Sequence, residues 1–159
     1  MITYCLAGLS PSIDTMEKLL YKLVEDDKEL KEALDIRKKV FVEEQGISGN
    51  LDQDGNDSDA LHVVIKKGDV AIGTLRIRFL TNQQAKLERM AILKHSRGSG
   101  IGRRVVSFLE KELKIRGIER IVLHAQYTVI NFYKKCGFKE IGLPFLEADI
   151  EHIRMEKDI

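Results

Sequence analysis

The sequence predicts an α+β fold in which one mixed sheet carries helices on its faces. Three segments with strand-like apolar patterns follow one another at 61–66, 70–79 and 87–93, and short turns join them. Apolar side chains at helical spacing flank this group, over 27–43 before it and beyond residue 102 after it. A run of sequential strands between amphipathic helices is typical of an α+β domain.

The other elements complete the order strand, helix, three strands, helix, strand, helix, two strands. A strand is expected at 19–24, and Asp26 and Glu29 have capping-box-like spacing for the helix that follows. The segment 45–59 is rich in Gly, Asn, Asp and Ser, which indicates a loop. The later elements are a helix that ends at Gly117, a strand at 118–125, a short helix at 128–135, and strands at 138–141 and 150–155.

Size and charge favour one ordinary globular domain. The chain has 159 residues, with 26 Lys and Arg against 25 Asp and Glu, and a net charge of +1. We therefore expect a single domain over 1–159, with residues 1–17 as an N-terminal extension. The near-neutral charge gives no electrostatic reason to expect nucleic acid or an anionic membrane as a partner.

The expected location is the cytoplasm. The N-terminus has no basic region typical of a secretory signal, and no apolar run reaches the roughly 18 residues of a spanning helix. Cys5 and Cys136 are too few for a disulfide framework and indicate a reducing compartment. Cys136 follows a short helix, whose negative C-terminal end disfavours a thiolate, so we expect a small core residue there and no nucleophile.

The most informative segment is the glycine-rich stretch Arg97-Gly98-Ser99-Gly100-Ile101-Gly102, between an apolar strand and a long helix. Free backbone N–H groups at the positive end of a helix bind phosphate or pyrophosphate. The dinucleotide fingerprint does not fit, because its third glycine comes one residue early, and Arg103-Arg104 replaces the Lys-Ser/Thr of a P-loop. A simple turn at a helix start is the alternative interpretation.

This stretch, together with Glu88-Arg89-Met90-Ala91-Ile92-Leu93 before it, resembles the acetyl-CoA motif of the GNAT acyltransferase superfamily. Downstream, residues 131–138, Asn-Phe-Tyr-Lys-Lys-Cys-Gly-Phe, are similar to that superfamily's Asn-x-x-Tyr…Gly-Phe signature. The resemblance covers about 27–155 and points to its small bacterial and archaeal members. It implies the GNAT fold, with a mostly antiparallel sheet of six or seven strands and helices on both faces.

The resemblance also implies a function. An N-acetyltransferase of this kind moves the acetyl group of acetyl-CoA, its co-substrate, to a primary amine of a small molecule or peptide, by direct attack in a ternary complex. A catalytically silent CoA-binding sensor or interaction module is the alternative. The sequence does not name the acceptor amine, and a homodimer remains open.

Site residues follow from the same resemblance. Tyr133 would protonate the departing thiolate, for which a phenol with a pKa near 10 is suited. Asn131 would hydrogen-bond the pantetheine arm, and the backbone of Met90 and Ile92 would pair with it. The full set expected to bind acetyl-CoA is Met90, Ala91, Ile92, Arg97, Gly98, Ser99, Gly100, Ile101, Gly102, Arg103, Asn131 and Tyr133.

Candidates for the catalytic base lie on two strands. Strict alternation would place Glu88 on the same face as Met90 and Ile92, looking into the cleft. Glu88 is either a base there or a solvated charge paired with Arg76 or Arg78 of the neighbouring strand.

Glu147 and His152 lie in a C-terminal block that resembles the Phe-x-Glu…Ile-x-His segment of a bacterial GNAT branch, and both are secondary catalytic candidates. A lone strand histidine can instead be a structural hydrogen-bonder. His62, His95 and His124 lack the spacing of metal ligands, and we expect no metal.

The loop 43–59 carries only negative charge. Its carboxylates, without any Lys or Arg between them, are Glu43, Glu44, Asp52, Asp54, Asp57 and Asp59. If the loop borders the acceptor site, its field would attract a cationic amine. The alternative is a solvated loop with no role in catalysis.

Overall fold

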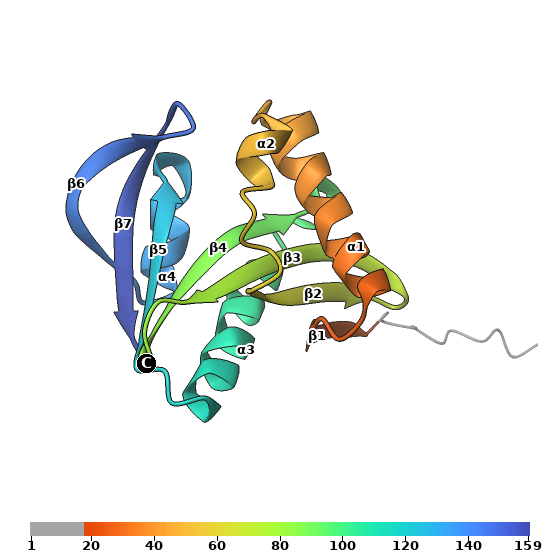
Figure 1. Cartoon of the computed structure of the whole chain (residues 1–159), viewed down its shortest axis with the longest axis horizontal. Helices are drawn as coiled ribbons and strands as arrows, with labels where there is room; N and C mark the ends of the chain where they lie inside the picture. The colour runs from red at the N-terminus through yellow and green to blue at the C-terminus, as the bar shows by residue number, and fades with distance from the viewer. Residues whose placement is uncertain (1–17) are drawn as a thin grey trace, which may run out of the picture.

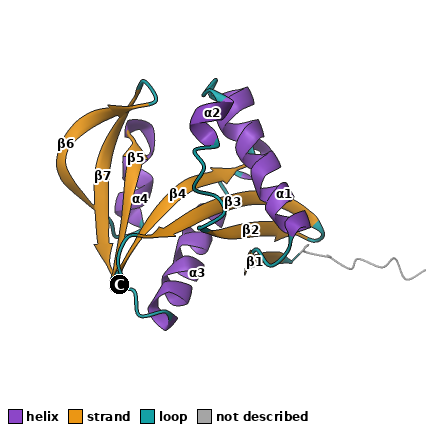
Figure 2. Ribbon diagram, in the orientation of Figure 1, coloured by secondary structure: helices purple, strands orange, loops and turns teal. Residues whose placement is uncertain are grey.

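The computed structural model describes residues 18–159, so the expected extension, with Cys5, lies outside the described residues. A seven-stranded sheet forms the centre, in the order β1-β2-β3-β4-β5-β7-β6 (Figures 1 and 2). The strands are β1 (Leu19–Leu23), β2 (Leu61–Lys67), β3 (Val70–Phe79), β4 (Gln84–Ile92), β5 (Arg120–Gln126), β6 (Lys139–Glu147) and β7 (Ile150–Asp158). The helices are α1 (Asp27–Arg37), α2 (Gly49–Asp52), α3 (Ile101–Ile115) and α4 (Ile130–Lys135).

Helices cover both faces of the sheet, which confirms the expected fold class and element order. α3 buries Val105, Leu109 and Leu113 against one face, in a cluster that includes Ile65 and Ile77. α1 and α2 lie on the other side of the sheet (Figure 1). The apolar stripe of α3, spaced at helical intervals, is therefore what holds this helix to the sheet.

The N-terminus of α1 forms as its spacing predicts. The side chain of Asp26 accepts a hydrogen bond from the Glu29 amide at 2.8 Å. The Glu29 carboxylate bonds back to the amide of Glu25 at 3.1 Å, one residue before the cap. The second bond of the capping box is thus shifted by one residue, and the backbone amides of Glu25 and Glu29 are both hydrogen-bonded.

One feature of the sheet creates room for a site. All neighbouring strands are antiparallel except β4 and β5, which run parallel. These two strands pair only from Gln84↔Arg120 to Leu87↔Leu123. Beyond Leu87 the strands diverge, and their ends at Ile92 and Gln126 bound an opening between the two halves of the sheet.

A bulge in β4 corrects the alternation expected for this strand. The paired positions Thr74↔Ala91 and Arg76↔Glu88 are two residues apart on β3 but three residues apart on β4. Arg89, within the longer segment, has φ +51°. Ala91 packs on the α1 side, whereas Met90 packs against the cluster that contains α3. Glu88 therefore does not share a face with Met90 and Ile92, because an extra residue inverts the side-chain order.

Several boundaries also differ from the expected ones. β4 starts three residues early, at Gln84, and β6 and β7 run on to Glu147 and Asp158. The expected first helix continues as a π-helical segment, Lys38–Glu44, and the loop 45–59 contains the short α2. Strand pairing lengthens β6 and β7, and such pairing is not visible in local composition.

Candidate active site

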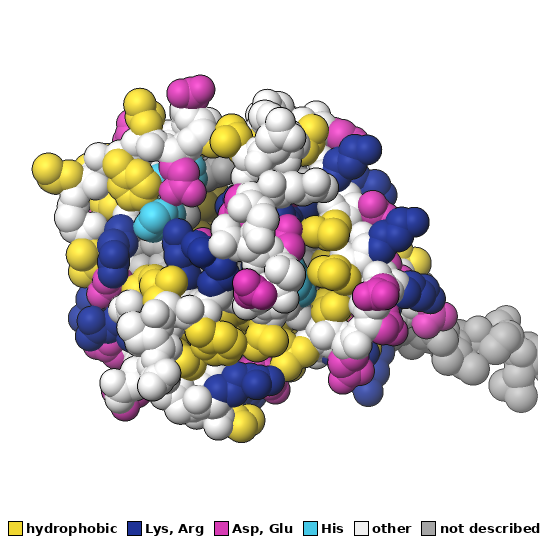
Figure 3. Space-filling view, in the orientation of Figure 1, with side chains coloured by type: hydrophobic (Ala, Val, Ile, Leu, Met, Phe, Trp, Pro, Cys, Tyr) yellow, Lys and Arg dark blue, Asp and Glu magenta, His cyan; other side chains and the backbone are white. Residues whose placement is uncertain are grey.

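The opening between β4 and β5 leads into a cavity of about 830 Å³. Its wall includes the ends of both strands, the glycine-rich loop, α4 and the β6–β7 hairpin. In the space-filling view, the molecule is hollowed between the C-terminal strands and the α2 loop, and histidine side chains show on the wall (Figure 3). Most residues proposed from the sequence meet in this one cavity.

The glycine-rich loop ends in the N-terminus of α3. Gly98 and Gly100 have φ of +83° and +76°, and Gly100 is the N-cap, with no side chain capping the helix. The first amides of α3 are thus open to an anion. Arg97, Gly98, Gly100, Ile101, Gly102 and Arg103 line the cavity. Ser99 is absent from that wall, and its hydroxyl donates to the Ser96 carbonyl at 3.2 Å.

The glycines of the loop differ in their surroundings. A Cβ on Gly98 or Gly100 would meet no protein atom within 4 Å, which leaves a space that a ligand can approach. A Cβ on Gly102 would lie 3.0 Å from the ring of Phe132 and 3.2 Å from the methyl carbon of Met90. Gly102 therefore permits close packing of α3 on α4 and β4, and the other two glycines shape an open cradle.

Replacing Gly100 with valine is expected to abolish acetyl-CoA binding while the fold persists. The side chain would stand in the open cradle, and the left-handed backbone would cost about 1–2 kcal/mol. Isothermal calorimetry measures the binding. Gly117, with φ +77° and equally open surroundings at the other end of α3, gives the control Gly117→Val. Normal binding by Gly100→Val would show that the loop is not the anion site.

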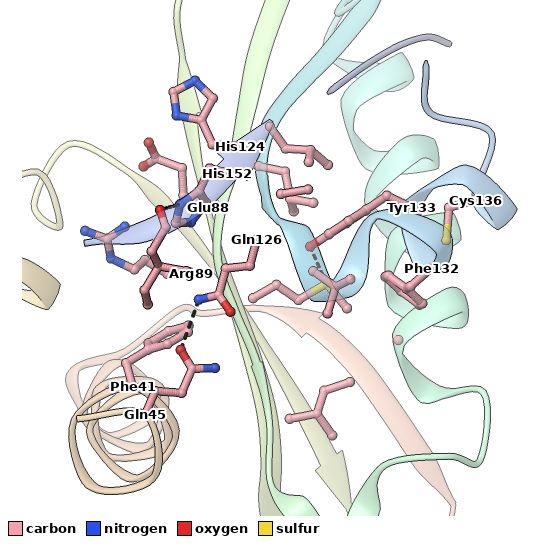
Figure 4. Close-up of a pocket in the computed structure, with 18 of the residues that line it drawn as sticks. Phe41, Gln45, Glu88, Arg89, His124, Gln126, Phe132, Tyr133, Cys136 and His152 are labelled. Atoms are coloured by element: carbon pink, nitrogen blue, oxygen red, sulfur yellow. Dashed lines mark hydrogen bonds between the residues drawn. The ribbon is translucent and has the colours of Figure 1, made fainter. Parts of the chain in front are cut away.

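Tyr133 lies at the centre of the cavity wall, on α4 (Figure 4). Its hydroxyl donates to the Met90 sulfur at 3.6 Å. Burial raises the pKa of Tyr133 well above its usual 10. The phenol therefore keeps its proton throughout the physiological range, as a proton donor must.

Cys136 and Asn131 are close to Tyr133 in the chain, but of these two only Cys136 lies on the cavity wall. Cys136 is half-buried on the same wall, and burial raises the pKa of its thiol, in agreement with the expected absence of a nucleophile. Asn131 is exposed on α4 and lies outside the cavity wall. Ala91 is also outside it, buried beside Ile36.

Glu88 is held by cations from two strands. Its carboxylate accepts bonds from Arg76 at 2.8 Å and Arg78 at 2.8 Å, and Lys86 lies at 3.0 Å. Burial raises the pKa of Glu88, but the bonds from Arg78 and Lys86 outweigh it, and the pKa falls to about 2. A carboxylate this weakly basic is a poor proton acceptor at neutral pH. The geometry favours the ion-pair alternative, although the pair is buried and not solvated.

The acidic loop is not the free negative rim expected from the sequence. Asp52 contacts Arg37 at 3.1 Å and Arg89 at 3.2 Å, and Asp57 contacts Arg37 at 2.6 Å. Arg76 contacts both Asp54 and Asp57, and Arg97 contacts Glu44. The compensating cations come from α1, β3, β4 and the glycine-rich loop, where local sequence does not reveal them. The expected attractive field is therefore wrong, because four of the six carboxylates are paired.

The C-terminal half of the cavity wall carries two histidines. His152, on β7, has its Nδ1 2.8 Å from the carbonyl of Ile150. A carbonyl only accepts, so Nδ1 carries the hydrogen, and Nε2 is the ring nitrogen that holds the lone pair of the neutral imidazole. His124, on β5, bonds through Nδ1 to Glu147 at 2.7 Å. Both histidines and Glu147 line the cavity.

Gln126 joins the two sides of the opening. Its amide donates to Gln45 at 3.0 Å, a contact between β5 and the end of the π-helical segment (Figure 4). His124, Gln126, Gln45 and Arg89 were not chosen from the sequence. For the two β5 residues, the alternation of apolar and polar residues along 123–126, Leu-His-Ala-Gln, is the signal that could have found them.

Residues 18–159 contain neither a candidate metal cluster nor a candidate membrane-spanning helix. Within that range no three His, Cys, Asp or Glu side chains lie together in a way that could hold a metal ion. In the same range no helix has the length and apolarity needed to cross a membrane.

Comparison with known proteins identifies the family. The family model of the acetyltransferase (GNAT) domain matches residues 21–159. The chain belongs to the GNAT acetyltransferase family. The uncharacterized N-acetyltransferase YjcF of Bacillus subtilis is 33% identical over 137 residues, which cover 86% of this chain and 97% of YjcF.

Solved structures agree with this assignment. An acyl-CoA N-acyltransferase from Pseudomonas aeruginosa matches with a TM-score of 0.76 and 25% identity, over 88% of this chain and 99% of that one. A GNAT acetyltransferase from Elizabethkingia anophelis, solved with acetyl-CoA bound, matches with a TM-score of 0.71 over 89% and 98% of the two chains. At 13% identity the latter shares the fold alone. The seven-stranded GNAT fold is thus the fold of this chain.

Proposed function

We propose that this GNAT protein is an acetyl-CoA-dependent N-acetyltransferase that acts on a primary amine by direct attack in a ternary complex. The observation that carries the proposal is that one cavity, where β4 and β5 separate, brings the required groups together. It joins an uncapped helix N-terminus, a buried tyrosine and a histidine with a free ring nitrogen. These are the groups that anion binding, leaving-group protonation and amine deprotonation require.

The donor side of the cavity fits acetyl-CoA. The α3 amides face open space beside Gly98 and Gly100, which suits a pyrophosphate. Past Leu87, β4 has no pairing with β5, so its backbone can take the pantetheine amides as an added strand. Acetyl-CoA supplies an activated thioester, and the chain supplies the groups that bind and orient it.

His152 and Tyr133 take the two proton-transfer roles. His152 accepts a proton at Nε2 from the attacking amine, whose nitrogen bonds to the acetyl carbon. Tyr133 gives its phenolic proton to the sulfur as the carbon–sulfur bond breaks. Glu88 is unsuited to the first role, because three cations hold its carboxylate. Among residues 18–159, the buried Tyr133 hydroxyl has only the weak sulfur acceptor of Met90, so it is free to turn to a thiolate.

Tyr133→Phe is expected to lower kcat by about 10²-fold, with little change in acetyl-CoA affinity, because it removes a general acid. Thiol release from acetyl-CoA measures kcat, and calorimetry measures affinity. Tyr127→Phe is the matched control, since Tyr127 is 59% exposed and lies outside the cavity wall. Unchanged turnover in Tyr133→Phe would reduce this residue to a packing role.

A CoA-binding module without turnover is the competing function. It would need the glycine-rich loop but neither Tyr133 nor His152. The presence of both residues on the cavity wall favours the enzyme.

A further inference from the structure

The cavity wall holds three carboxylates, and two of them are already neutralised. Asp52 is 5% exposed and contacts Arg37 and Arg89. Glu88 contacts Arg76, Arg78 and Lys86. Neither carboxylate has capacity to spare for a cationic ligand, because further pairing would have to displace a guanidinium or ammonium group.

Glu147 is the exception. Its contact at ion-pair distance among residues 18–159 is His124, which is charged only if protonated, and 43% of its side chain is exposed. The hydrogen bond from His124, with the more distant charge of Lys86, holds the pKa of Glu147 below its usual value, so the carboxylate is ionised at neutral pH. One carboxylate oxygen, Oε2, faces the imidazole, which leaves Oε1 for a second partner.

The charged groups beside the cavity nearly cancel one another. The network beside the cavity has five cations, Arg37, Arg76, Arg78, Lys86 and Arg89, and four carboxylates, Asp52, Asp54, Asp57 and Glu88. Glu147 brings the two signs to balance. The cavity wall also carries Arg97, Arg103 and Lys135, so the cleft has no net negative charge to steer an amine from a distance, and recognition depends on direct contact.

Glu147 and His152 stand on one hairpin. In the register of β6 and β7, Phe145 pairs with His152 and Glu147 pairs with Ile150. Two residues along a strand separate these positions, a rise of about 7 Å. The Phe145 ring contacts both imidazoles, with distances between ring centroids of 4.9 Å to His124 and 6.1 Å to His152. An anionic group thus stands a short distance from the proposed base.

We propose that Glu147, oriented by His124, binds a second cationic group of the acceptor, so that the preferred acceptors are diamines with a short aliphatic spacer. The neutral amine attacks beside His152, and the remote ammonium pairs with the Glu147 carboxylate. This inference rests on the proposed function. It moves acceptor recognition from the loop 43–59, whose carboxylates are largely paired, to the β6–β7 hairpin.

The test is a series of α,ω-diamines of increasing length, each compared with the monoamine of equal carbon number. Thiol release gives kcat/KM for each amine, divided by its number of primary amino groups, and the measured quantity is the ratio of this value for the diamine to that for the monoamine. The wild-type ratio is expected to reach about fivefold at an optimum length, the factor of a partly exposed ion pair. Glu147→Gln should bring the ratio to about one, and Glu147→Lys should bring it below one.

Glu151→Gln is the matched control, because Glu151 is an exposed carboxylate of the same hairpin outside the cavity wall. It should keep the wild-type ratio. A wild-type ratio of one at every length would overturn the inference, as would a ratio that survives Glu147→Gln or is lost in Glu151→Gln. Acetylation of monoamines in those cases would leave the proposed function standing. Transfer to no amine at all would overturn both.

Discussion

Replacing His152 with glutamine is expected to lower kcat/KM for amine acetylation by about 10³-fold at neutral pH. Glutamine can still donate to the Ile150 carbonyl, but it has no nitrogen that accepts a proton. The deficit should shrink as the pH rises toward about 10, where aliphatic amines lose their proton without a base. A pH profile of thiol release measures both effects.

A purely structural role for His152 predicts another pattern. The deficit would then be independent of pH, and thermal unfolding of His152→Gln would shift markedly. His95→Gln is the control, because His95 is exposed on the turn before the glycine-rich loop and lies outside the cavity wall. A deficit of less than tenfold in His152→Gln at neutral pH would assign the base elsewhere.

The second large effect concerns stability. Arg76→Met is expected to lower the free energy of unfolding by about 3–5 kcal/mol, because it leaves buried charge uncompensated. The Arg76 side chain is fully buried and contacts Asp54, Asp57 and Glu88. Urea denaturation measures the change.

Arg120→Met is the matched control for that experiment. Arg120 contacts Asp158 at 2.6 Å, but 47% of its side chain is exposed. Exposed ion pairs contribute about 0–1 kcal/mol, so this variant should unfold almost as the wild type does. Equal effects of the two substitutions would contradict the role assigned to Arg76.

The sequence was sufficient for the order of the main elements and for the position of the glycine-rich loop before α3. Apolar periodicity located the helices, and the glycines before α3 identified the N-terminus that the structure leaves uncapped. These features are local, since each depends on residues within a few positions of one another.

Features that depend on contacts between distant residues were not predictable in this way. The bulge at Arg89 reverses which side chains of β4 point to each face of the sheet, and the sequence pattern of 87–93 does not indicate a bulge. The arginines that neutralise the acidic loop lie on α1, β3 and β4, far from it along the chain. His124 meets Glu147 because β7 brings β5 and β6 together, which the spacing of 23 residues does not indicate.

The most direct test of the account is the product of the reaction. Purified protein is incubated with acetyl-CoA and representative monoamines, diamines, amino sugars and lysine peptides, and mass spectrometry follows each amine while a thiol reagent follows CoA. We expect an N-acetylated amine formed in step with CoA release, and loss of both in Tyr133→Phe and His152→Gln. Binding of acetyl-CoA without acetylation of any of these amines would contradict it.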